Sequence, residues 1–194
     1  MPDQSYRTFL KNLEQQGELI HFTKEVDPAE NMSAIEWKAY NELGKASLFS
    51  NLKGHEGWQA TSQILSDRKK WAIGLGVSED NILDEMSERL RQTIKTVEVD
   101  SDAAPVQEVV FKGDAVNILD VPSMMTSEDD GGRYFASGMA IVKDPETGIR
   151  NMSVHRQMIL NERETGLIML PRQAKRIYDM YAAQGKGMPV AMVY

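Results

Sequence analysis

The sequence of 194 residues contains no cysteine, comparatively few basic residues and no long apolar run. The absence of cysteine excludes disulfides, thiol catalysis and thiolate metal sites, and it fits a reducing compartment. The apolar runs are too short to cross a membrane, and the N-terminal MPDQSYRTFL is too polar for a signal peptide. We therefore expect a cytoplasmic protein.

The charge balance is acidic, since 22 lysines and arginines stand against 29 aspartates and glutamates, a formal net charge of −7. This balance argues against non-specific binding to nucleic acids, but basic groups can still gather around an anionic ligand. With 41% hydrophobic and 26% charged residues, the composition is that of a globular protein with one large domain or two small ones.

Familiar catalytic motifs are missing as well. The sequence has no GxSxG, HExxH, P-loop or GxGxxG motif, and the GLG at Gly74–Gly76 follows an expected helix instead of a strand. It contains neither an internal repeat nor a low-complexity segment. The function must therefore be sought in individual residues and their spacing.

Helical and strand patterns alternate through the first ninety or so residues. Apolar residues at helical spacing end at Gly17 and again at Gly44, and glycine is favoured just after a helix. The expected elements are helices at 4–16, at Met32–Leu43, after Asp67 and after Ser78, with strands at Leu19–Phe22, Ser47–Phe49 and Gln59–Leu65. This alternation predicts a small α/β domain at residues 1–98.

From Val97 onward, short β-type runs separated by turn clusters dominate. The expected strands are Val97–Val99, Val106–Phe111, Val116–Ile118, Phe135–Val142, Met152–Leu160 and Leu167–Leu170. The DPETG sequence predicts a hairpin turn with Gly148 at a positive φ angle. With a helix at Gln173–Ala183 and a strand at Pro189–Tyr194, residues 99–194 form a second, β-rich domain of an α/β (α+β) fold. Because the chain ends within that strand, we expect a longer polypeptide.

The stretch GIRNMSVHR, Gly148–Arg156, alternates as a strand does, so its side chains should divide between two faces. The polar face has Asn151, Ser153 and His155, and the apolar face has Met152, Val154, Arg156 and Met158. A polar strand face is often only solvated. Arg156 is less usual, because a buried, unpaired guanidinium is costly. It is exposed at an edge, closes a salt bridge, or binds a ligand's carboxylate or phosphate.

The preceding stretch EDDGGRY, Glu128–Tyr134, allows two interpretations. Its three acids could bind a divalent cation, but no second ligand cluster follows, so a tight acidic surface turn is the more common meaning. Of the histidines, His21 and His55 are expected at incidental surface positions, and His155 is of interest because it adjoins Arg156.

Several stretches together resemble the UbiD family of reversible (de)carboxylases. They are FLKNLEQQGELIHFTKEVDP, LFSNLKG, DGGRY, KDPETGIRNMSVHR and LPRQ, of which GIRNMSVHR is the most specific part. The resemblance implies a small α/β domain followed by part of a split β-barrel domain that carries prenylated FMN. In this family a C-terminal oligomerisation region follows.

The resemblance also implies roles for individual residues. Arg156 matches the arginine of the family's Glu–Arg–Glu catalytic network, and Asn151 matches an asparagine that binds a divalent metal at the cofactor phosphate. The implied cofactor contacts are Asn151, Met152, Ser153, Val154, His155, Arg156 and Gln173. Ala174 stands where many relatives have a metal-binding histidine, and the family's glutamates are expected beyond residue 194.

The implied activity is reversible, non-oxidative decarboxylation of an aromatic, heteroaromatic or α,β-unsaturated carboxylic acid through a covalent adduct with prenylated FMN. The implied cofactors are prenylated FMN, a divalent metal such as Mn²⁺, and K⁺. The implied partners are a flavin prenyltransferase that supplies the cofactor, the remainder of the enzyme, and further copies in a homo-oligomer. The 194-residue chain alone is expected to be inactive. Two alternatives stay open: a non-catalytic flavin-binding or partner-binding subunit, and a flavin-reductase-type barrel with ordinary FMN.

Overall fold

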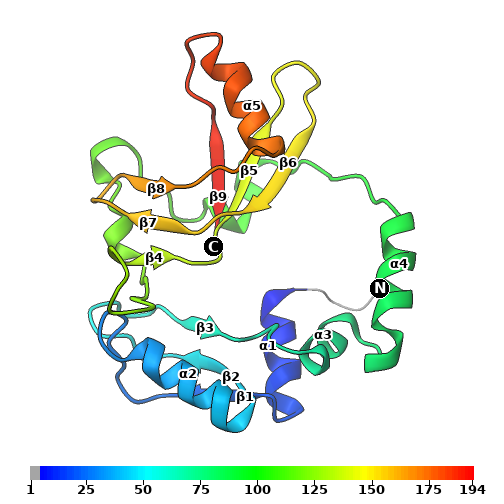
Figure 1. Ribbon diagram of the computed structural model, residues 1–194, viewed down its shortest axis with the longest axis vertical. Coiled ribbons are helices and arrows are strands. Elements are labelled where there is room, and N and C mark those ends of the chain that lie inside the picture. Colours follow the sequence, from blue (N-terminus) through cyan, green and yellow to red (C-terminus); the bar gives the residue numbers. More distant parts are fainter. Residues whose placement is uncertain (1–4) are drawn as a thin grey trace. The chain divides into compact units, whose positions relative to one another are not determined.

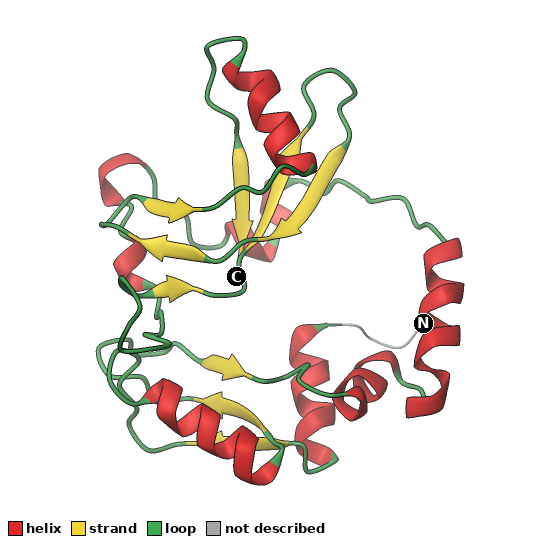
Figure 2. Cartoon of the chain, viewed as in Figure 1, coloured by secondary structure: helices red, strands yellow, loops and turns green. Residues whose placement is uncertain are grey.

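The structure is a computed structural model that describes residues 5–194 (Figures 1 and 2). The chain divides into two compact units. The first unit takes in the chain up to Asp27 and Asn31–Ala115, and the second takes in Pro28–Glu30 and Val116–Tyr194. Both units contain helices and strands, which confirms the predicted α/β (α+β) class.

The first unit is built on a three-stranded sheet in the order β1-β2-β3. Its strands are β1 Leu19–Phe22, β2 Ala46–Phe49 and β3 Ala60–Ser62. β1 and β2 are parallel, with Leu19 opposite Ala46, and β3 is antiparallel to β2. A parallel pair needs a crossover connection, which here contains the predicted helix α2, Met32–Leu43.

The helices predicted for this region are present, and local signals explain where they begin and end. They are α1 Tyr6–Gln15, α2 Met32–Leu43, α3 Arg68–Leu75 and α4 Ile82–Arg91, the last preceded by the 3₁₀ turn η1 Glu79–Asn81. Residue 4, the first of the predicted helix 4–16, lies outside the described residues. The Asp67 carboxylate accepts a hydrogen bond from Lys70 N at 3.0 Å and caps α3, as predicted. Gly44 ends α2 with a φ of 65°, a conformation that costs glycine little.

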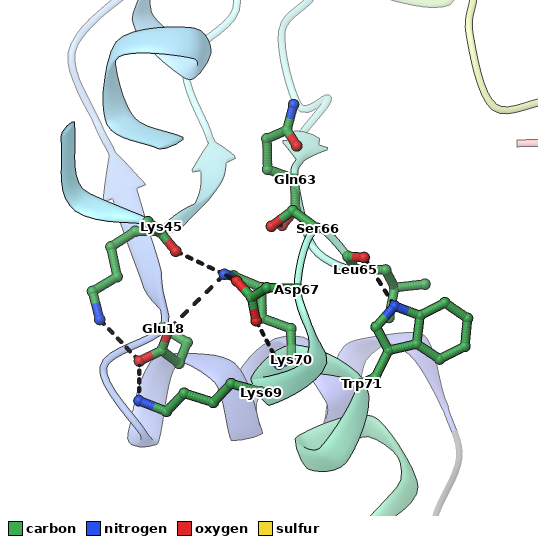
Figure 3. A network of polar contacts seen from close by, with 10 residues as sticks. Glu18, Lys45, Gln63, Leu65, Ser66, Asp67, Lys69, Lys70 and Trp71 are labelled. Carbon is green, nitrogen blue, oxygen red and sulfur yellow. Dashed lines mark hydrogen bonds and ion pairs between the residues drawn. The ribbon is translucent and has the colours of Figure 1, made fainter. Parts of the chain in front are cut away.

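A lysine that is fully buried connects α3 to the end of α2 (Figure 3). The Lys70 ammonium donates to the carbonyl oxygen of Gly44 at 2.7 Å and to the carboxylate of Asp67. It also lies 3.9 Å from Glu18 Oε2. Because each of these groups compensates the buried charge, Lys70 holds three chain segments together instead of destabilising the unit.

Glu18, at the start of β1, is also buried and receives two further lysines (Figure 3). Its Oε1 accepts from Lys69 at 2.6 Å and from Lys45 at 2.9 Å. Burial alone would raise the pKa of this carboxyl, but the hydrogen bonds from Lys69 and Lys45 outweigh burial and hold the pKa below its ordinary value. The charged form of Glu18 is therefore the stable one in the folded unit.

The segment that follows α4 differs from the prediction. Val97–Val99, Val106–Phe111 and Val116–Ile118 are not strands. The regular structure there consists of 3₁₀ turns, namely η2 Ser101–Ala103, η3 Pro105–Gln107, η4 Gly113–Ala115 and η5 Ile118–Asp120. Val97 is 83% exposed and Val106 80% exposed. A β-type composition forms a strand only when a neighbouring strand pairs with it, and within the described chain these runs have no such neighbour.

The second unit has two three-stranded antiparallel sheets, in the orders β4-β7-β8 and β6-β5-β9. The strands are β4 Tyr134–Phe135, β5 Met139–Lys143, β6 Arg150–Val154, β7 Gln157–Ile159, β8 Thr165–Leu167 and β9 Val190–Val193. β9 confirms the last predicted strand, and β8 begins two residues before the predicted Leu167–Leu170. Over the described residues the two sheets stay open and do not close into a barrel.

Two runs that were predicted as single strands each divide between these sheets. The run Phe135–Val142 becomes β4 and β5, and the run Met152–Leu160 becomes β6 and β7. Phe135 lies opposite Gln157, and Met139 lies opposite Val154. The three residues between β4 and β5, 136–138, therefore face only the two residues between β6 and β7, 155 and 156. This extra residue is a β-bulge, which bends the paired strands from one sheet into the next.

Helix α5, Gln173–Ala182, packs on one face of the second sheet beside β5 and β6 (Figure 1). A buried cluster joins Ala174 and Ile177 of α5 to Val142 of β5. The predicted DPETG hairpin precedes β6, and Gly148 has the expected positive φ, 72°. The helix and the hairpin are tied together by Arg176, which donates to Asp144 Oδ2 at 2.6 Å.

Candidate functional site

The bulge places Arg156 at the bend between β6 and β7. His155 and Arg156 are the two residues opposite the bulge, and His155 N donates to the carbonyl oxygen of Gly138 at 2.8 Å. Gly138 is required here, because a Cβ at this position would lie 2.6 Å from Gln157 Nε2 and 2.9 Å from the Tyr194 ring. Bulges commonly redirect a side chain next to a functional site, and here the redirected side chain is Arg156.

The Arg156 guanidinium is held by two residues of the EDDGGRY segment. Its Nη2 donates to Asp130 Oδ2 at 2.8 Å, and its Cζ lies 4.0 Å from the centre of the Tyr134 ring. The Arg156 side chain is 47% exposed and that of Asp130 is 16% exposed. Of the options left open by the sequence, the described residues therefore show a salt bridge at a partly exposed position, with a cation–π contact added.

The EDDGG stretch is a tight turn that packs against β7. Asp130 Oδ2 accepts a hydrogen bond from the backbone N–H of Ser127 at 3.1 Å, which fixes the carboxylate within its own turn. A Cβ at Gly131 would lie 3.3 Å from Met158 Sδ, and Tyr134 Oη donates to the same sulfur at 3.3 Å. The surface-turn interpretation of this segment therefore fits its geometry, and one of its acids serves Arg156.

The polar face of β6 is the one that α5 covers. Asn151 lies opposite Val142 and Ser153 opposite Ala140, and residues that pair across strands share a face. Val142 packs against α5, so Asn151 and Ser153 lie on the helix side of the sheet, half-buried. Ser153 Oγ is 2.9 Å from His155 Nε2, so these two polar groups are paired.

The face with Met152 and Val154 is open instead. Met152 is 64% exposed and Val154 66% exposed. The apolar side chains expected around Arg156 are therefore exposed to solvent and do not bury it. Arg156 is itself partly exposed, so its charge is not held in an apolar interior. The structure therefore separates the predicted contact residues into two sets, of which Asn151, Ser153 and His155 form the half-buried one.

Gln173 is the first residue of α5 and is exposed. The residue before the helix, Arg172, makes no side-chain cap hydrogen bond, so the first N–H groups of α5 are left without a side-chain cap. Such a helix start favours an anionic group, a phosphate included. Asn151 and Ser153 lie on the face of the sheet that α5 covers, so an amide, a hydroxyl and an uncapped helix start occur on the same side of the sheet.

A complete metal centre does not fit the described residues. No group of three or more His, Cys, Asp or Glu side chains in residues 5–194 is arranged to hold a metal ion. Of the residues implied as metal ligands, Asn151 offers an amide oxygen. Ala174, at the implied histidine position, is a buried alanine that packs on Val142 and Ile177. A metal at Asn151 would need its other ligands from elsewhere.

Gln157 is a buried polar residue beside Gly138 of the bulge, and the sequence did not single it out. It is 1% exposed, and its Oε1 accepts from Tyr194 Oη at 3.0 Å and from Thr165 Oγ1 at 3.2 Å, while its Nε2 has no hydrogen-bond partner among the described residues. Burial raises the pKa of the Tyr194 hydroxyl, and the bond to Gln157 lowers it only in part. The alternation that placed Asn151, Ser153 and His155 on one face extends to Gln157 and could have indicated it.

Comparisons with known proteins agree with this architecture. A family model described as the 3-octaprenyl-4-hydroxybenzoate carboxy-lyase Rift-related domain of UbiD matches residues 97–194. The model of the N-terminal domain of the same carboxy-lyase matches residues 10–90. The chain belongs to the UbiD family. The resemblance stated from the sequence is thereby confirmed.

Curated relatives in the UbiD family include decarboxylases. Ferulic acid decarboxylase 1 of Saccharomyces cerevisiae is 28% identical over 211 residues, which cover 100% of this chain and 42% of that protein. Pyrrole-2-carboxylic acid decarboxylase of Pseudomonas aeruginosa is 28% identical over 200 residues, covering 96% of this chain and 40% of that protein. The chain thus spans about two fifths of the length of these relatives.

Solved structures of UbiD-class enzymes superpose on the chain. The evolved dimeric form of HmfF from Pelotomaculum thermopropionicum, in complex with prFMN, matches with a TM-score of 0.89 at 26% identity, covering 98% of this chain and 44% of that one. Vanillic acid decarboxylase from Sedimentibacter hydroxybenzoicus matches in its closed form with a TM-score of 0.90 at 24% identity, covering 99% and 43%. The second likeness shows the fold alone. Among the described residues, no helix is long and apolar enough to span a membrane.

Proposed function

We propose that this chain is the N-terminal portion of a prenylated-FMN-dependent decarboxylase. The observation that carries the proposal is Arg156, a partly exposed cation held at a bulge in the UbiD-type unit. The likeness to HmfF, whose structures are in complex with prFMN and with FMN, supports the flavin. Relatives named for ferulic and pyrrole-2-carboxylic acids support an aromatic, heteroaromatic or α,β-unsaturated acid as the substrate.

The proposed cofactor contacts are the ones that the sequence indicated. They are Asn151, Met152, Ser153, Val154, His155, Arg156 and Gln173. Asn151, Ser153 and Gln173 would hold the phosphate end of prenylated FMN at the start of α5, while Met152 and Val154 supply an apolar surface on the open side of β6. When bound, prenylated FMN would supply an electrophilic centre for the covalent adduct that the resemblance implies, and with it a sink for the electron pair that CO₂ leaves behind.

Arg156 would bind the carboxylate of the acid. A planar guanidinium can hold a carboxylate by two parallel hydrogen bonds, which fixes the plane of the carboxylate as well as its position. As the bond to the carboxylate carbon breaks, the negative charge leaves the carboxyl group and CO₂ departs neutral. Arg156 therefore orients the acid before the bond breaks, and the acid that returns a proton to the product is proposed to lie in the remainder of the enzyme.

The metal part of the proposal is limited to one ligand. Asn151 would contribute an oxygen to a divalent ion such as Mn²⁺, with K⁺ as a second ion, and a complete ligand set would need groups from outside residues 5–194, within which no cluster of three His, Cys, Asp or Glu side chains is arranged to hold a metal. Ala174 cannot replace a histidine ligand, because it has no donor atom and is packed in a core. No step of the reaction is assigned to the metal.

We further propose that the domain boundary lies near residue 98, close to the start of the second matched family domain, which covers residues 97–194. The proposed context is a cytoplasmic homo-oligomer whose cofactor comes from a flavin prenyltransferase. A non-catalytic flavin-binding or partner-binding subunit is the alternative. It is favoured by the absence of any carboxylate other than Asp130 bonded to Arg156 in the described chain.

The cofactor proposal is tested by producing the complete protein with and without a flavin prenyltransferase. We expect purified protein from the co-expression to carry prenylated FMN, identified by its absorbance spectrum and by the mass of the extracted flavin. Protein that carries only ordinary FMN in both cases would support a flavin-reductase-type barrel, and protein that never retains flavin would contradict the proposal.

A further inference from the structure

The Asp130 carboxylate is held in place by a contact that does not involve Arg156. Its side chain is only 16% exposed, and its Oδ2 accepts a hydrogen bond from Ser127 N at 3.1 Å within the same turn. The same oxygen accepts from Arg156 Nη2 at 2.8 Å. The turn thus presents a carboxylate oxygen at a defined place, 26 residues away from the arginine along the chain.

Arg156, in contrast, has little else to fix it. Its side chain is 47% exposed, and its guanidinium contacts only Asp130 and the face of Tyr134 in the described chain. An arginine side chain has many rotamers, so without these contacts the guanidinium would occupy many positions. The bulge fixes the backbone of Arg156, and Asp130 with Tyr134 fixes its head group.

This arrangement leaves donors available for a ligand. A guanidinium has five N–H groups, and Asp130 engages Nη2 alone. The remaining N–H groups bond to no residue of the described chain, and the exposed part of the side chain provides access to them. The geometry thus separates an anchoring contact from the contacts that a substrate carboxylate can use.

We propose that Asp130 is the positioning residue for Arg156: it holds the guanidinium over the Tyr134 ring so that the remaining N–H groups receive the carboxylate of the acid. The inference rests on the proposed decarboxylase function. The inference gives one acid of the EDDGGRY segment a role, which the proposed function by itself does not. Its matched control is Asp129, which neighbours Asp130, carries the same charge and is exposed.

The positioning itself is tested in the 194-residue chain by NMR of arginine side chains labelled with ¹³C and ¹⁵N. Arg156→Lys identifies the Arg156 signals. Asp130→Asn keeps one oxygen that can accept from Ser127 N, removes the negative charge and replaces the second carboxylate oxygen by an NH2 group. Because the charge that attracts the guanidinium is lost, we expect this substitution to speed rotation about the Arg156 Cζ–Nη bonds several-fold and to shift the Nη resonances. Asp129→Asn should leave both unchanged. Arg156 signals in Asp130→Asn that match those of the wild-type chain would overturn the proposal.

The functional consequence is tested in the complete holoenzyme with its flavin content measured in each variant. We expect Asp130→Asn to lower kcat/KM about tenfold or more, Asp130→Glu to recover part of the loss, and Asp129→Asn to match wild type. Flavin content should not change. Equal kinetics for Asp130→Asn and Asp129→Asn would overturn the role of Asp130 while leaving the proposed function intact. A wild-type enzyme that releases no CO₂ would contradict the proposed function instead, and the NMR result would still decide whether Asp130 positions Arg156.

Discussion

Arg156 owes its position to three neighbours that differ in kind. Gly138 leaves room at the bulge for the side chains of Gln157 and Tyr194. Asp130 neutralises the charge, and Tyr134 presents the face of its ring. A lysine could satisfy Asp130 but could not stack as a plane on the ring or present two parallel donors to a carboxylate. The residue type therefore agrees with the recognition of a planar anion.

Replacing Arg156 should remove activity without emptying the flavin site. In the complete holoenzyme, Arg156→Ala is expected to lower turnover by about a hundredfold or more, because it removes the charged donors that orient the acid. Arg156→Lys should lose less. Turnover is measured as CO₂ release, and flavin content by absorbance. Unchanged turnover in Arg156→Ala would sink the assigned role.

Gly138 is expected to tolerate no side chain. Gly138→Ala puts a methyl group 2.6 Å from Gln157 Nε2 and 2.9 Å from the Tyr194 ring, so the chain should lose about 1–3 kcal/mol of unfolding free energy. Gly187→Ala is the control, since a Cβ there meets nothing within 4 Å. Urea titration compares the two variants, and equal stabilities would show that the close approach at Gly138 is relieved without cost.

The sequence indicated Arg156 but not its partner. Alternation along GIRNMSVHR placed this arginine on the apolar face of the strand and left exposure, a salt bridge or an anionic ligand as the options, because alternation is a local property of a strand. Asp130 could not be singled out from Glu128 and Asp129, since only the turn geometry decides which of the three acids points toward β7. The exposure of the Met152 face was not predictable either, as it depends on what lies against that face.

At the scale of elements, the predictions that depend only on neighbouring residues were confirmed. Asp67 and Gly44 were correctly predicted as helix ends, because caps depend on neighbouring backbone groups. The run Val106–Phe111 was wrongly predicted as a strand, because a strand depends on a distant partner that composition does not reveal. The bulge was missed for the same reason, since it exists only in the register between two strands.

Asp144 links the β5–β6 hairpin to α5, and its charge should make the chain pH-sensitive. Hydrogen bonds from the backbone N–H of Thr147 and from Arg176 outweigh burial and lower the pKa of Asp144 to about 2, from an ordinary value near 3.9. A depressed folded-state pKa gives stability that is present above about pH 4 and is lost as the pH falls toward 2.

The chain with Asp144→Asn should therefore be less stable than wild type at pH 6, and the difference should shrink as the pH is lowered from about 4 toward 2. Thermal or urea unfolding of both chains across this range measures the difference. A difference that stays constant over the whole range would contradict the linkage to the Asp144 carboxylate.

Two adjacent lysines of α3 offer a matched test of burial. Lys70 is fully buried and anchors Gly44, whereas the Lys69 side chain is 52% exposed although it also binds Glu18. We expect Lys70→Met to cost about 3 kcal/mol of unfolding free energy, because it leaves buried acceptors without a donor. Lys69→Met removes the same charge and should cost much less. Similar losses for the two variants would show that charge, not burial, controls this network.

For the whole molecule, the order of domains was predictable and the chemistry was not. The sequence predicts the change from interleaved helices and strands to short β-type runs near Val97. The two family models match residues 10–90 and 97–194, whereas the compact units of the structure divide between Ala115 and Val116. The substrate was out of reach, because a single sequence does not rank the residues that select an acid. The chain spans about two fifths of its relatives' length, so the proposed reaction belongs to the complete enzyme.

The most direct test of the account is head-space CO₂ detection with a panel of aromatic, heteroaromatic and α,β-unsaturated acids. The complete protein, produced with a flavin prenyltransferase, is expected to release CO₂ from at least one acid, and the 194-residue chain treated in the same way is expected to release none. Within residues 5–194, Asp130 is the only acid bonded to Arg156. Complete protein that is loaded with prenylated FMN and yet leaves every acid unchanged, or robust turnover by the chain alone, would contradict the account.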